Sequence, residues 1–196
     1  MNKNKNNYEE DKSDIDSNTV GVYRTAATVK GGRRFSFSAM IVCGDRQGRV
    51  GLGYGKANQV PNAIEKAQKK AKRAMREFPL TGTTIPHEVT GSYGACSVRL
   101  VPASPGTGVI AGAAVRAVLD LLGVQDCLTK AFGSTNNKNL TKAVIDGLQQ
   151  LRSRETVERL RKVAIDKTHT ETSHEAAPVA LDVTGNEDSK SEEVTA

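Results

Sequence analysis

The segment that most constrains the fold is a glycine-interrupted strand followed at once by an alanine-rich helix. Residues 49–57 read RVGLGYGKA, so that glycine stands at every second position from Gly51 to Gly55. Alternate residues of a strand share one face, and three glycines leave that face without side chains. The pattern leaves two alternatives open: tight packing of another backbone, or a surface strand that meets RNA.

The helix that follows is expected over residues 60–78, where Pro61 suits the first turn. Its apolar residues recur every three or four positions and form a single stripe. Small alanines dominate the stripe, which allows the helix to lie close against a sheet. The stripe consists of Ile64, Ala67, Ala71, Ala74, Met75 and Phe78.

Two further strands are expected before the glycine strand, over residues 22–30 and 34–43. The second alternates apolar residues on one face, as a half-buried strand does. This predicts core positions for Phe35, Phe37, Ala39, Ile41 and Cys43. Three strands and one helix then form a first domain, residues 20–83, of about 60 residues, which depends on its neighbour for stability.

The second half, residues 84–165, reads as a β-β-α-β-α domain, so that the whole chain is of the α+β class. The first of its helices is apolar on most sides and is expected to be buried. A final short helix is expected near residues 155–164. The expected strands and helices are residues 84–90, 95–102, 109–122, 126–133 and 136–151.

Charge is distributed very unevenly along the chain, whose net charge is +6. Residues 1–19 carry −2 and residues 166–196 carry −6, which leaves +14 on the body between them. The two acidic tails lack aromatic clusters and are expected to be disordered. A body with so many cations favours nucleic acid as its partner.

Several classes of protein are excluded by the residues present. No apolar run is long enough to span a membrane, and the polar, acidic N-terminus resembles neither a signal nor a transit peptide. Cys43, Cys96 and Cys127 have the spacing of neither a disulfide framework nor a metal site and fit a reduced, cytoplasmic protein. Gly51 to Lys56 lacks the serine or threonine of a nucleotide-binding loop. We expect no catalytic residue, cofactor, metal or small-molecule substrate.

The candidate RNA contacts lie first in the turn KGGRR, where two glycines free the backbone and three cations neutralise phosphate. The alternative is a solvated loop. A second group lies on the helix over 60–78, whose basic face only Glu65 and Glu77 interrupt; most such faces are merely solvated, but this one is nearly single-signed. The predicted contacts are Lys30, Gly31, Gly32, Arg33, Arg34, Arg46, Arg49, Gly53, Tyr54, Gly55, Lys56, Lys66, Lys69, Lys70 and Arg73.

Two turns that precede expected helices form a third group. Free N–H groups at a helix N-terminus attract phosphate oxygens, although simple capping by Thr107, Ser134 or Asn136 explains each turn equally well. The predicted contacts here are Thr107, Ser134, Asn136 and Asn137. Aromatic stacking platforms are not expected, because the phenylalanines fit the core better.

Two long blocks of the sequence resemble the S5 family of bacterial small-subunit ribosomal proteins. The first runs TVKGGRRFSFSAMIVCGDRQGRVGLGYGKANQVPNAIEKA, and the second runs PASPGTGVIAGAAVRAVLDLLGVQDCLTKAFGSTN. The resemblance implies an N-terminal domain like double-stranded-RNA-binding domains and a C-terminal domain with a left-handed βαβ crossover. That hand is opposite to the general rule. The tail after residue 166 has no counterpart in the family pattern.

The resemblance also implies partners and a place in the cell. The family binds 16S-type ribosomal RNA, contacts ribosomal proteins S4 and S8, lies near the path of messenger RNA into the particle, and supports decoding fidelity. By motif, the Lys30–Gly32 loop would reach an RNA helix, and Gly108 and Arg116 would face S4. A free-standing regulator that binds double-stranded RNA is the alternative, and a nucleotide-dependent enzyme is disfavoured.

Overall fold

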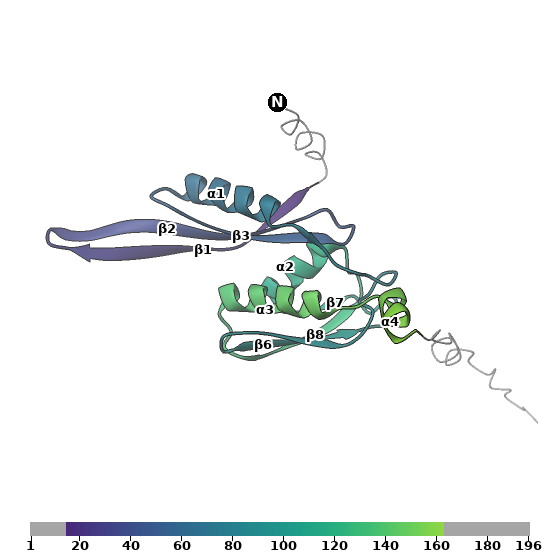
Figure 1. Cartoon of the computed structure of the whole chain (residues 1–196). Coiled ribbons are helices and arrows are strands. Elements are labelled where there is room, and N and C mark those ends of the chain that lie inside the picture. Colours follow the sequence, from purple (N-terminus) through teal and green to yellow (C-terminus); the bar gives the residue numbers. More distant parts are fainter. Residues whose placement is uncertain (1–14, 163–196) are drawn as a thin grey trace, which may run out of the picture. The chain divides into compact units, whose positions relative to one another are not determined.

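The computed structural model describes residues 15–162, whose strands form two four-stranded sheets. The chain is of the α+β class, as predicted, with helices packed on the sheets (Figure 1). The predicted tail over residues 166–196 lies outside the described residues, as does the greater part of the predicted N-terminal tail.

The first sheet is antiparallel and has the order β1-β2-β3-β4. Its strands are β1 (Asp16–Val29), β2 (Gly32–Gly44), β3 (Arg49–Ala57) and β4 (Arg76–Glu77). The prediction for β1 was wrong at its start, because Asp16 to Thr19 already pair with β2. These residues are polar, but ladder hydrogen bonds to a long neighbouring strand need no apolar side chains.

Helix α1 (Val60–Arg73) packs on β3 and β2 through Ala63, Ala67 and Ala71, which are fully buried. The helix ends five residues before its predicted end, and Arg76 and Glu77 pair with β3 instead. Phe78 is buried as predicted, but from the chain beyond β4 rather than from a helix.

Strand β2 is buried on both of its faces, whereas alternation predicted only one. Ala39, Ile41 and Cys43 lie beneath α1, as predicted. Met40 and Val42 on the other face are also buried, and Val42 joins the core formed with the second half of the chain. The second half therefore supplies cover that the pattern of one strand does not reveal.

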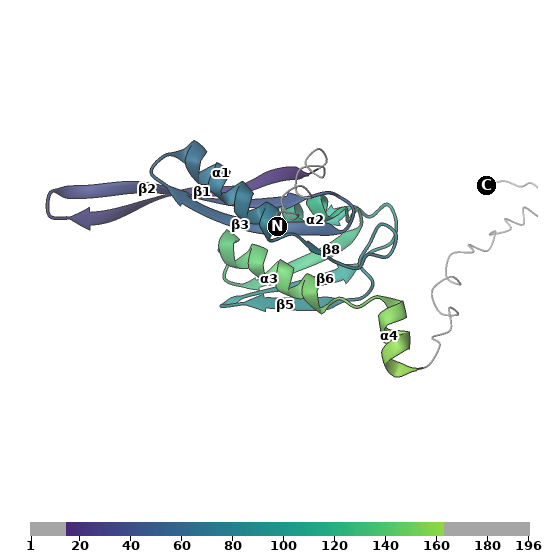
Figure 2. The ribbon, with the colours of Figure 1, turned by 45° about the horizontal axis from the view of Figure 1, so that its top comes forward.

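The second sheet has the order β5-β6-β8-β7, in which only β7 and β8 are parallel. Its strands are β5 (Val89–Tyr93), β6 (Cys96–Pro102), β7 (Val109–Ile110) and β8 (Cys127–Gly133). Helix α2 (Ala113–Leu122) lies between β7 and β8 in sequence and completes a βαβ unit. Helices α3 (Asn137–Gln150) and α4 (Arg154–Arg161) follow (Figure 2).

Several predicted boundaries in this half were wrong. The strand expected over residues 84–90 ends at Tyr93, and the helix expected near residues 155–164 ends at Arg161. The strand expected over residues 84–90 begins only at Val89, since Pro86 cannot donate a ladder hydrogen bond. The helix expected from residue 109 begins at Ala113, because Val109 and Ile110 pair with β8 as a short strand. The strand β8 and the helix α3 match their predicted ranges within one residue.

The main core lies between α2, α3 and both sheets. Seven of the ten residues of α2 are buried, as its apolar sequence predicted. Cys43, Cys96 and Cys127 are buried as free thiols, and burial raises the pKa of the Cys127 thiol to about 11. Within residues 15–162, no helix is long and apolar enough to cross a membrane.

Candidate nucleic-acid interface

A two-stranded arm carries the first group of predicted contacts. Strand β3 pairs with β2 only from Phe37 onward, so that residues 25–36 of β1 and β2 extend beyond the third strand (Figure 1). Lys30 and Gly31 form the turn at the tip, and Gly32 adopts φ 140°, which a residue with a side chain rarely does. The predicted loop is therefore an exposed, protruding hairpin.

The cations of the arm point to both of its faces. Arg33 lies opposite Thr28 and Arg34 opposite Ala27, and successive side chains of a strand alternate between faces. Lys30, Arg33 and Arg34 are exposed, and none of them forms an ion pair with another residue of 15–162. Uncompensated cations on a narrow hairpin suit contact with phosphates on either side of it.

Phe35, near the base of the arm, is more exposed than predicted. Phe35 was expected in the core, but its side chain is 42% exposed, and Phe37 is only half-buried. Helix α1 covers Ala39, Ile41 and Cys43 but not this part of the strand. The guanidinium carbon of Arg24 lies 3.6 Å from the centroid of the Phe35 ring. The expectation that no aromatic residue is available for stacking was therefore wrong for Phe35.

The second group of predicted contacts lies together on α1 and the edge of β3. Lys66, Lys69, Lys70 and Arg73 of the helix line a pocket of about 350 Å³ together with Tyr54, Gly55 and Lys56. Lys69 donates a hydrogen bond of 2.7 Å to Glu65, which lowers the pKa of that carboxyl. In the described part of the chain the other three helix cations have no ion pair, so that the pocket is strongly electropositive.

Gly53 does not line this pocket, and Gly55 lines it without offering a side chain. Both are buried beneath α1, and a Cβ at Gly53 would lie 2.0 Å from the carbonyl oxygen of Ala67. A Cβ at Gly55 would lie 2.2 Å from the carbonyl oxygen of Ala63. Of the two alternatives for the glycine strand, the structure therefore has tight packing at these glycines. The outward side chains are those of Tyr54 and Lys56.

Arg49, predicted as an RNA contact, has a structural partner. Its guanidinium donates a 2.6 Å hydrogen bond to Asp45, whose side chain is only 4% exposed. Burial disfavours the Asp45 carboxylate, but hydrogen bonds from the Gln47 and Arg49 amides and from the Arg49 guanidinium outweigh it and lower the pKa of Asp45. Arg49 thus neutralises a buried charge and stabilises the β2–β3 turn.

Arg46 in the same turn connects the two halves of the fold. Its backbone has φ 58°, and its amide donates a 3.0 Å hydrogen bond to the carbonyl of Leu121 at the end of α2. Its exposed side chain forms a 2.9 Å ion pair with Asp16, which is also exposed. The exposed guanidinium remains available to a phosphate that displaces Asp16.

The turn before β7 does not lie at a helix N-terminus, so the helix-end reason for an RNA contact at Thr107 was wrong, and the contact itself stays a prediction. Its amides instead surround the carboxylate of Asp126, which accepts a 2.9 Å hydrogen bond from the Gly108 amide. Bonds from Gly108, the Thr83 side chain, Gly106 and Thr107 lower the pKa of Asp126.

Gly108 and Arg116, the residues expected to face another protein, lie close together. Arg116 donates a 3.0 Å hydrogen bond to the carbonyl of Val109, the residue after Gly108. Both belong to the β7–α2 segment, and Val109 and Arg116 line a pocket together with Arg46, Asp120, Gly123, Val124 and Gln125. Arg116 therefore contacts the residue that follows Gly108, while Gly108 itself does not line the pocket.

At the start of α3 the structure shows the capping alternative. Asn136 is the N-cap and accepts a 3.1 Å hydrogen bond from the Lys138 amide, and Ser134 accepts one of 3.4 Å from the Asn136 amide. Asn137 is the first residue of the helix. Lys138, which was not among the predicted residues, lies over the Tyr54 ring at 4.3 Å from its centroid. Its place in the first turn of a predicted helix was the available signal.

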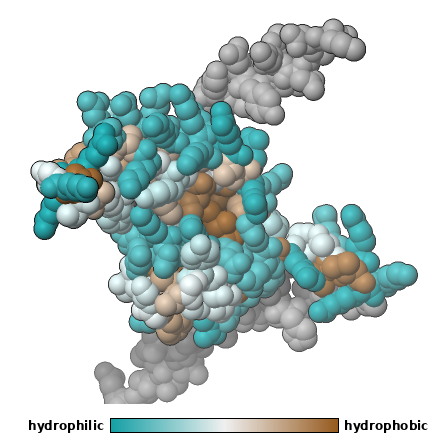
Figure 3. Space-filling model, turned by 60° about the vertical axis from the view of Figure 1, so that its left-hand side comes forward, coloured by the Kyte–Doolittle hydropathy of each residue, from teal (hydrophilic) through white to brown (hydrophobic). Residues whose placement is uncertain are grey.

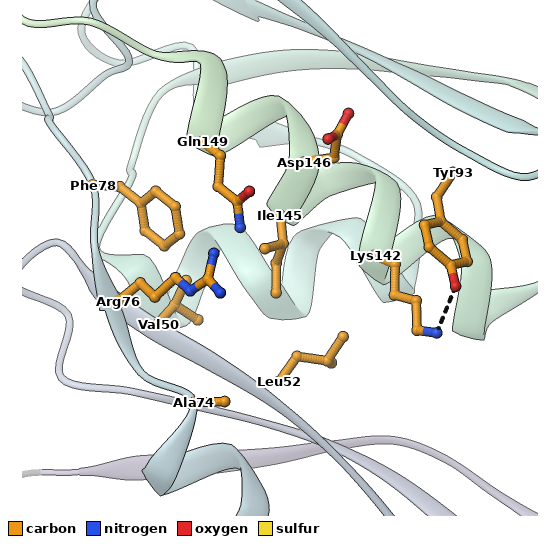
Figure 4. A pocket seen from close by; sticks show the side chains of 10 residues that line it. All are labelled: Val50, Leu52, Ala74, Arg76, Phe78, Tyr93, Lys142, Ile145, Asp146 and Gln149. Atoms are coloured by element: carbon orange, nitrogen blue, oxygen red, sulfur yellow. Dashed lines mark hydrogen bonds between the residues drawn. The ribbon is translucent and has the colours of Figure 1, made fainter.

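An apolar pocket of about 290 Å³ lies apart from these cations. Val50, Leu52, Phe78 and Ile145 converge on it, and Arg76, Gln149 and Asp146 stand around it (Figure 4). Lys142 donates a 3.0 Å hydrogen bond to the Tyr93 hydroxyl at one end. Hydrophilic residues cover most of the face in Figure 3, with a hydrophobic area near its centre and others toward its edges. Within residues 15–162, no cluster of side chains could hold a metal ion.

Comparison with known proteins gives this surface a family context. The family models described as ribosomal protein S5, N-terminal domain, and ribosomal protein S5, C-terminal domain, match residues 15–79 and 91–161. A relative from Rubrobacter xylanophilus, named small ribosomal subunit protein uS5, is 56% identical over 153 residues, which cover 78% of this chain and 76% of the relative.

Two further relatives carry the same name. The one from Syntrophobacter fumaroxidans is 57% identical over 142 residues, covering 72% of this chain and 86% of the relative. The one from Thermus thermophilus is 53% identical over 150 residues, covering 76% and 93%. The family is one of structural rather than catalytic proteins. Both halves of the fold, with the arm and α1 in the first, therefore belong to a member of the ribosomal protein S5 family.

Proposed function

We propose that this protein is a structural constituent of the small ribosomal subunit in the cytoplasm, where it binds small-subunit ribosomal RNA. The observation that carries the proposal is a group of cations on the arm tip and on α1 that form no ion pair within residues 15–162: Lys30, Arg33, Arg34, Lys66, Lys70 and Arg73. The names of the relatives support the ribosomal setting. Such a surface neutralises phosphates and reads the shape of RNA more than its sequence.

The arm and the helix supply different contacts. The arm is a narrow hairpin with cations on both faces, which suits insertion between RNA backbones. The α1 pocket is broader and presents its cations from one helix face and from Lys56 of β3. Gly31 and Gly32 at the tip carry no side chain, and the space around them is open, because a Cβ at either would meet nothing within 4 Å. The backbone itself can therefore approach a phosphate there.

Contacts with ribosomal proteins S4 and S8, a place near the path of messenger RNA and a role in decoding fidelity are part of the proposal. The resemblance to the family supports them, and by that resemblance Gly108 and Arg116, which lie near each other, would face S4. Replacement of Arg116 by alanine is expected to raise stop-codon readthrough in cells without removing the protein from the subunit. Unchanged readthrough would contradict the role of this surface.

Sedimentation tests the main proposal. The full-length chain is expected to migrate with small subunits in sucrose gradients of cell lysate at moderate salt. A triple variant, Lys30→Ala with Arg33→Ala and Arg34→Ala, is expected to bind small-subunit RNA more weakly and to reduce the salt slope by about 2 to 3. The matched control removes three exposed cations elsewhere, through Lys130→Ala, Arg159→Ala and Arg161→Ala.

Three outcomes would count against the proposal. A chain that stays at the top of the gradient would favour a free-standing regulator that binds double-stranded RNA. Equal losses in the arm and control variants would show that net charge matters and the arm does not. A salt slope unchanged by the arm variant would show that these cations make no phosphate contacts.

A further inference from the structure

One feature of the arm is not explained by phosphate binding. Phe35 is a large apolar side chain, yet 42% of it is exposed on a hairpin that no helix covers. Leaving an aromatic ring in water forgoes the stabilisation that its burial would bring. The ring is not isolated, because the guanidinium of Arg24 lies over it at 3.6 Å.

The register of the strands places this pair beside a further cation. Arg24 lies opposite Phe37 and Phe35 opposite Ala26, which puts Arg24 and Phe35 diagonally across one face of the arm. Arg33 stands two residues before Phe35 on the same face, about 7 Å along the strand. The stacked guanidinium and ring thus lie two positions along the strand from Arg33, a cation that forms no ion pair within residues 15–162.

We propose that Arg24 and Phe35 form a stacking platform for one unpaired RNA base, with Arg33 neutralising an adjacent phosphate. The inference rests on the proposed RNA-binding function and adds the kind of RNA feature that the arm recognises. Bases within a duplex are already stacked, whereas a bulged or looped-out base is free to stack on an aromatic ring or an arginine plane. The arm therefore distinguishes RNA that contains an unpaired nucleotide from a continuous helix.

Two RNA hairpins test the proposal. They share the same stem and the same compact loop, whose own bases stack on one another, and they differ only in a single nucleotide bulged from the stem of one of them. Both are titrated with the full-length protein, and binding is followed by fluorescence anisotropy. The natural chain is expected to bind the bulged hairpin at least about fivefold more tightly, the lower end of the effect of one base stacked on an aromatic ring. Because stacking is not a charge interaction, the ratio is expected to persist when salt weakens both affinities.

Conservative variants separate stacking from charge and folding. Phe35→Leu keeps an apolar side chain but removes the ring, and Arg24→Lys keeps the charge but removes the guanidinium plane. Both are expected to lose most of the preference for the bulge while retaining affinity for the paired hairpin. Phe132→Leu is the matched control, because Phe132 is 48% exposed on the second sheet. That variant is expected to keep the preference.

The outcomes distinguish this inference from the proposed function. Equal binding of both hairpins by the natural chain would overturn the inference and leave RNA binding intact. A preference that survives Phe35→Leu would also overturn it, since the ring would then play no part. Failure to bind either hairpin would overturn both the inference and the proposed function.

Discussion

The ammonium nitrogen of Lys138 lies 4.3 Å from the centroid of the Tyr54 ring and donates a 3.3 Å hydrogen bond to the Tyr54 hydroxyl. The contact joins the first turn of α3 to strand β3 across 84 positions of the sequence. A hydrogen bond with Ser38 is the largest influence on the tyrosine, and Lys138 adds to it, so that the pKa of Tyr54 is lowered. The same lysine lies 5.5 Å from the ring centroid of Tyr23.

Replacement of Lys138 by methionine is expected to raise the pKa of Tyr54. The variant removes both a hydrogen-bond donor to the hydroxyl and a positive charge that favours the tyrosinate. Titration of isotope-labelled tyrosine rings by NMR measures the change. Lys142→Met is the control, since Lys142 lies over Tyr93 rather than Tyr54. If the pKa of Tyr54 shifted in Lys142→Met but not in Lys138→Met, Lys138 would not be a cause of the lowered pKa of Tyr54.

Gly53→Ala is expected to lower the free energy of unfolding by about 3 kcal/mol, at the upper end of the usual cost of overpacking. The added methyl would meet the Ala67 carbonyl and the Ala71 amide, and backbone atoms cannot move aside as a flexible side chain can. Denaturant unfolding measures the loss. The control is Gly112→Ala, where the methyl meets nothing within 4 Å and a cost below about 1 kcal/mol is expected. Similar losses in both variants would contradict close packing as the cause.

Asp45→Ala is expected to cost about 3 kcal/mol of stability, because two backbone amides and a guanidinium lose a charged acceptor. Asp16→Ala removes a carboxylate from an ion pair in which both partners are exposed, and is expected to cost less than about 1 kcal/mol. Chemical denaturation of both variants gives the comparison. Equal losses of unfolding free energy would show that the buried contacts of Asp45 stabilise the fold no more than an exposed ion pair does.

The Asp45 carboxylate also makes the stability of the fold depend on pH in the acid range. The pKa of Asp45 is lower in the folded chain than its ordinary value, so its contribution is present above the unfolded pKa of about 3.9 and is lost as pH falls through the folded pKa. Asp126 acts with the same sign. The unfolding free energy of the natural chain is therefore expected to fall below about pH 5, and less steeply in Asp45→Ala. Parallel pH profiles would contradict this.

The sequence was most informative where local pattern and tertiary packing agree. The alanine stripe and the glycine strand predicted a helix lying close on a sheet, and Gly53 against Ala67 is that contact. The apolar segment before Gly123 predicted a buried helix, which α2 is. In both cases the residue types present are compatible with only one environment, a close backbone contact for the glycines and alanines and the core for the apolar helix.

The predictions were wrong for residues whose surroundings are formed by segments distant in the sequence. Phe35 continues the alternation of β2, but only the positions from Ala39 onward lie under α1, and the length of a covering helix cannot be read from the strand. Thr107 precedes an apolar run, yet two residues of that run pair with β8, which is distant in sequence. In the sequence Arg49 cannot be told apart from the neighbouring basic residues, because only the structure shows that it pairs with the buried Asp45.

Backbone amides in the arm are expected to exchange with solvent much faster than those in the centre of the same strands. In residues 25–36 the two strands pair only with each other, and two-stranded ribbons are marginal in water. Ile41 and Val42 of β2 are instead held between β1 and β3 and are fully buried. Hydrogen exchange of the full-length chain, alone and with the bulged RNA hairpin, measures both regions. Because bound RNA would cover the arm, protection is expected to rise there and stay constant at Ile41 and Val42. Equal protection of both regions without RNA would show that the arm is stable by itself.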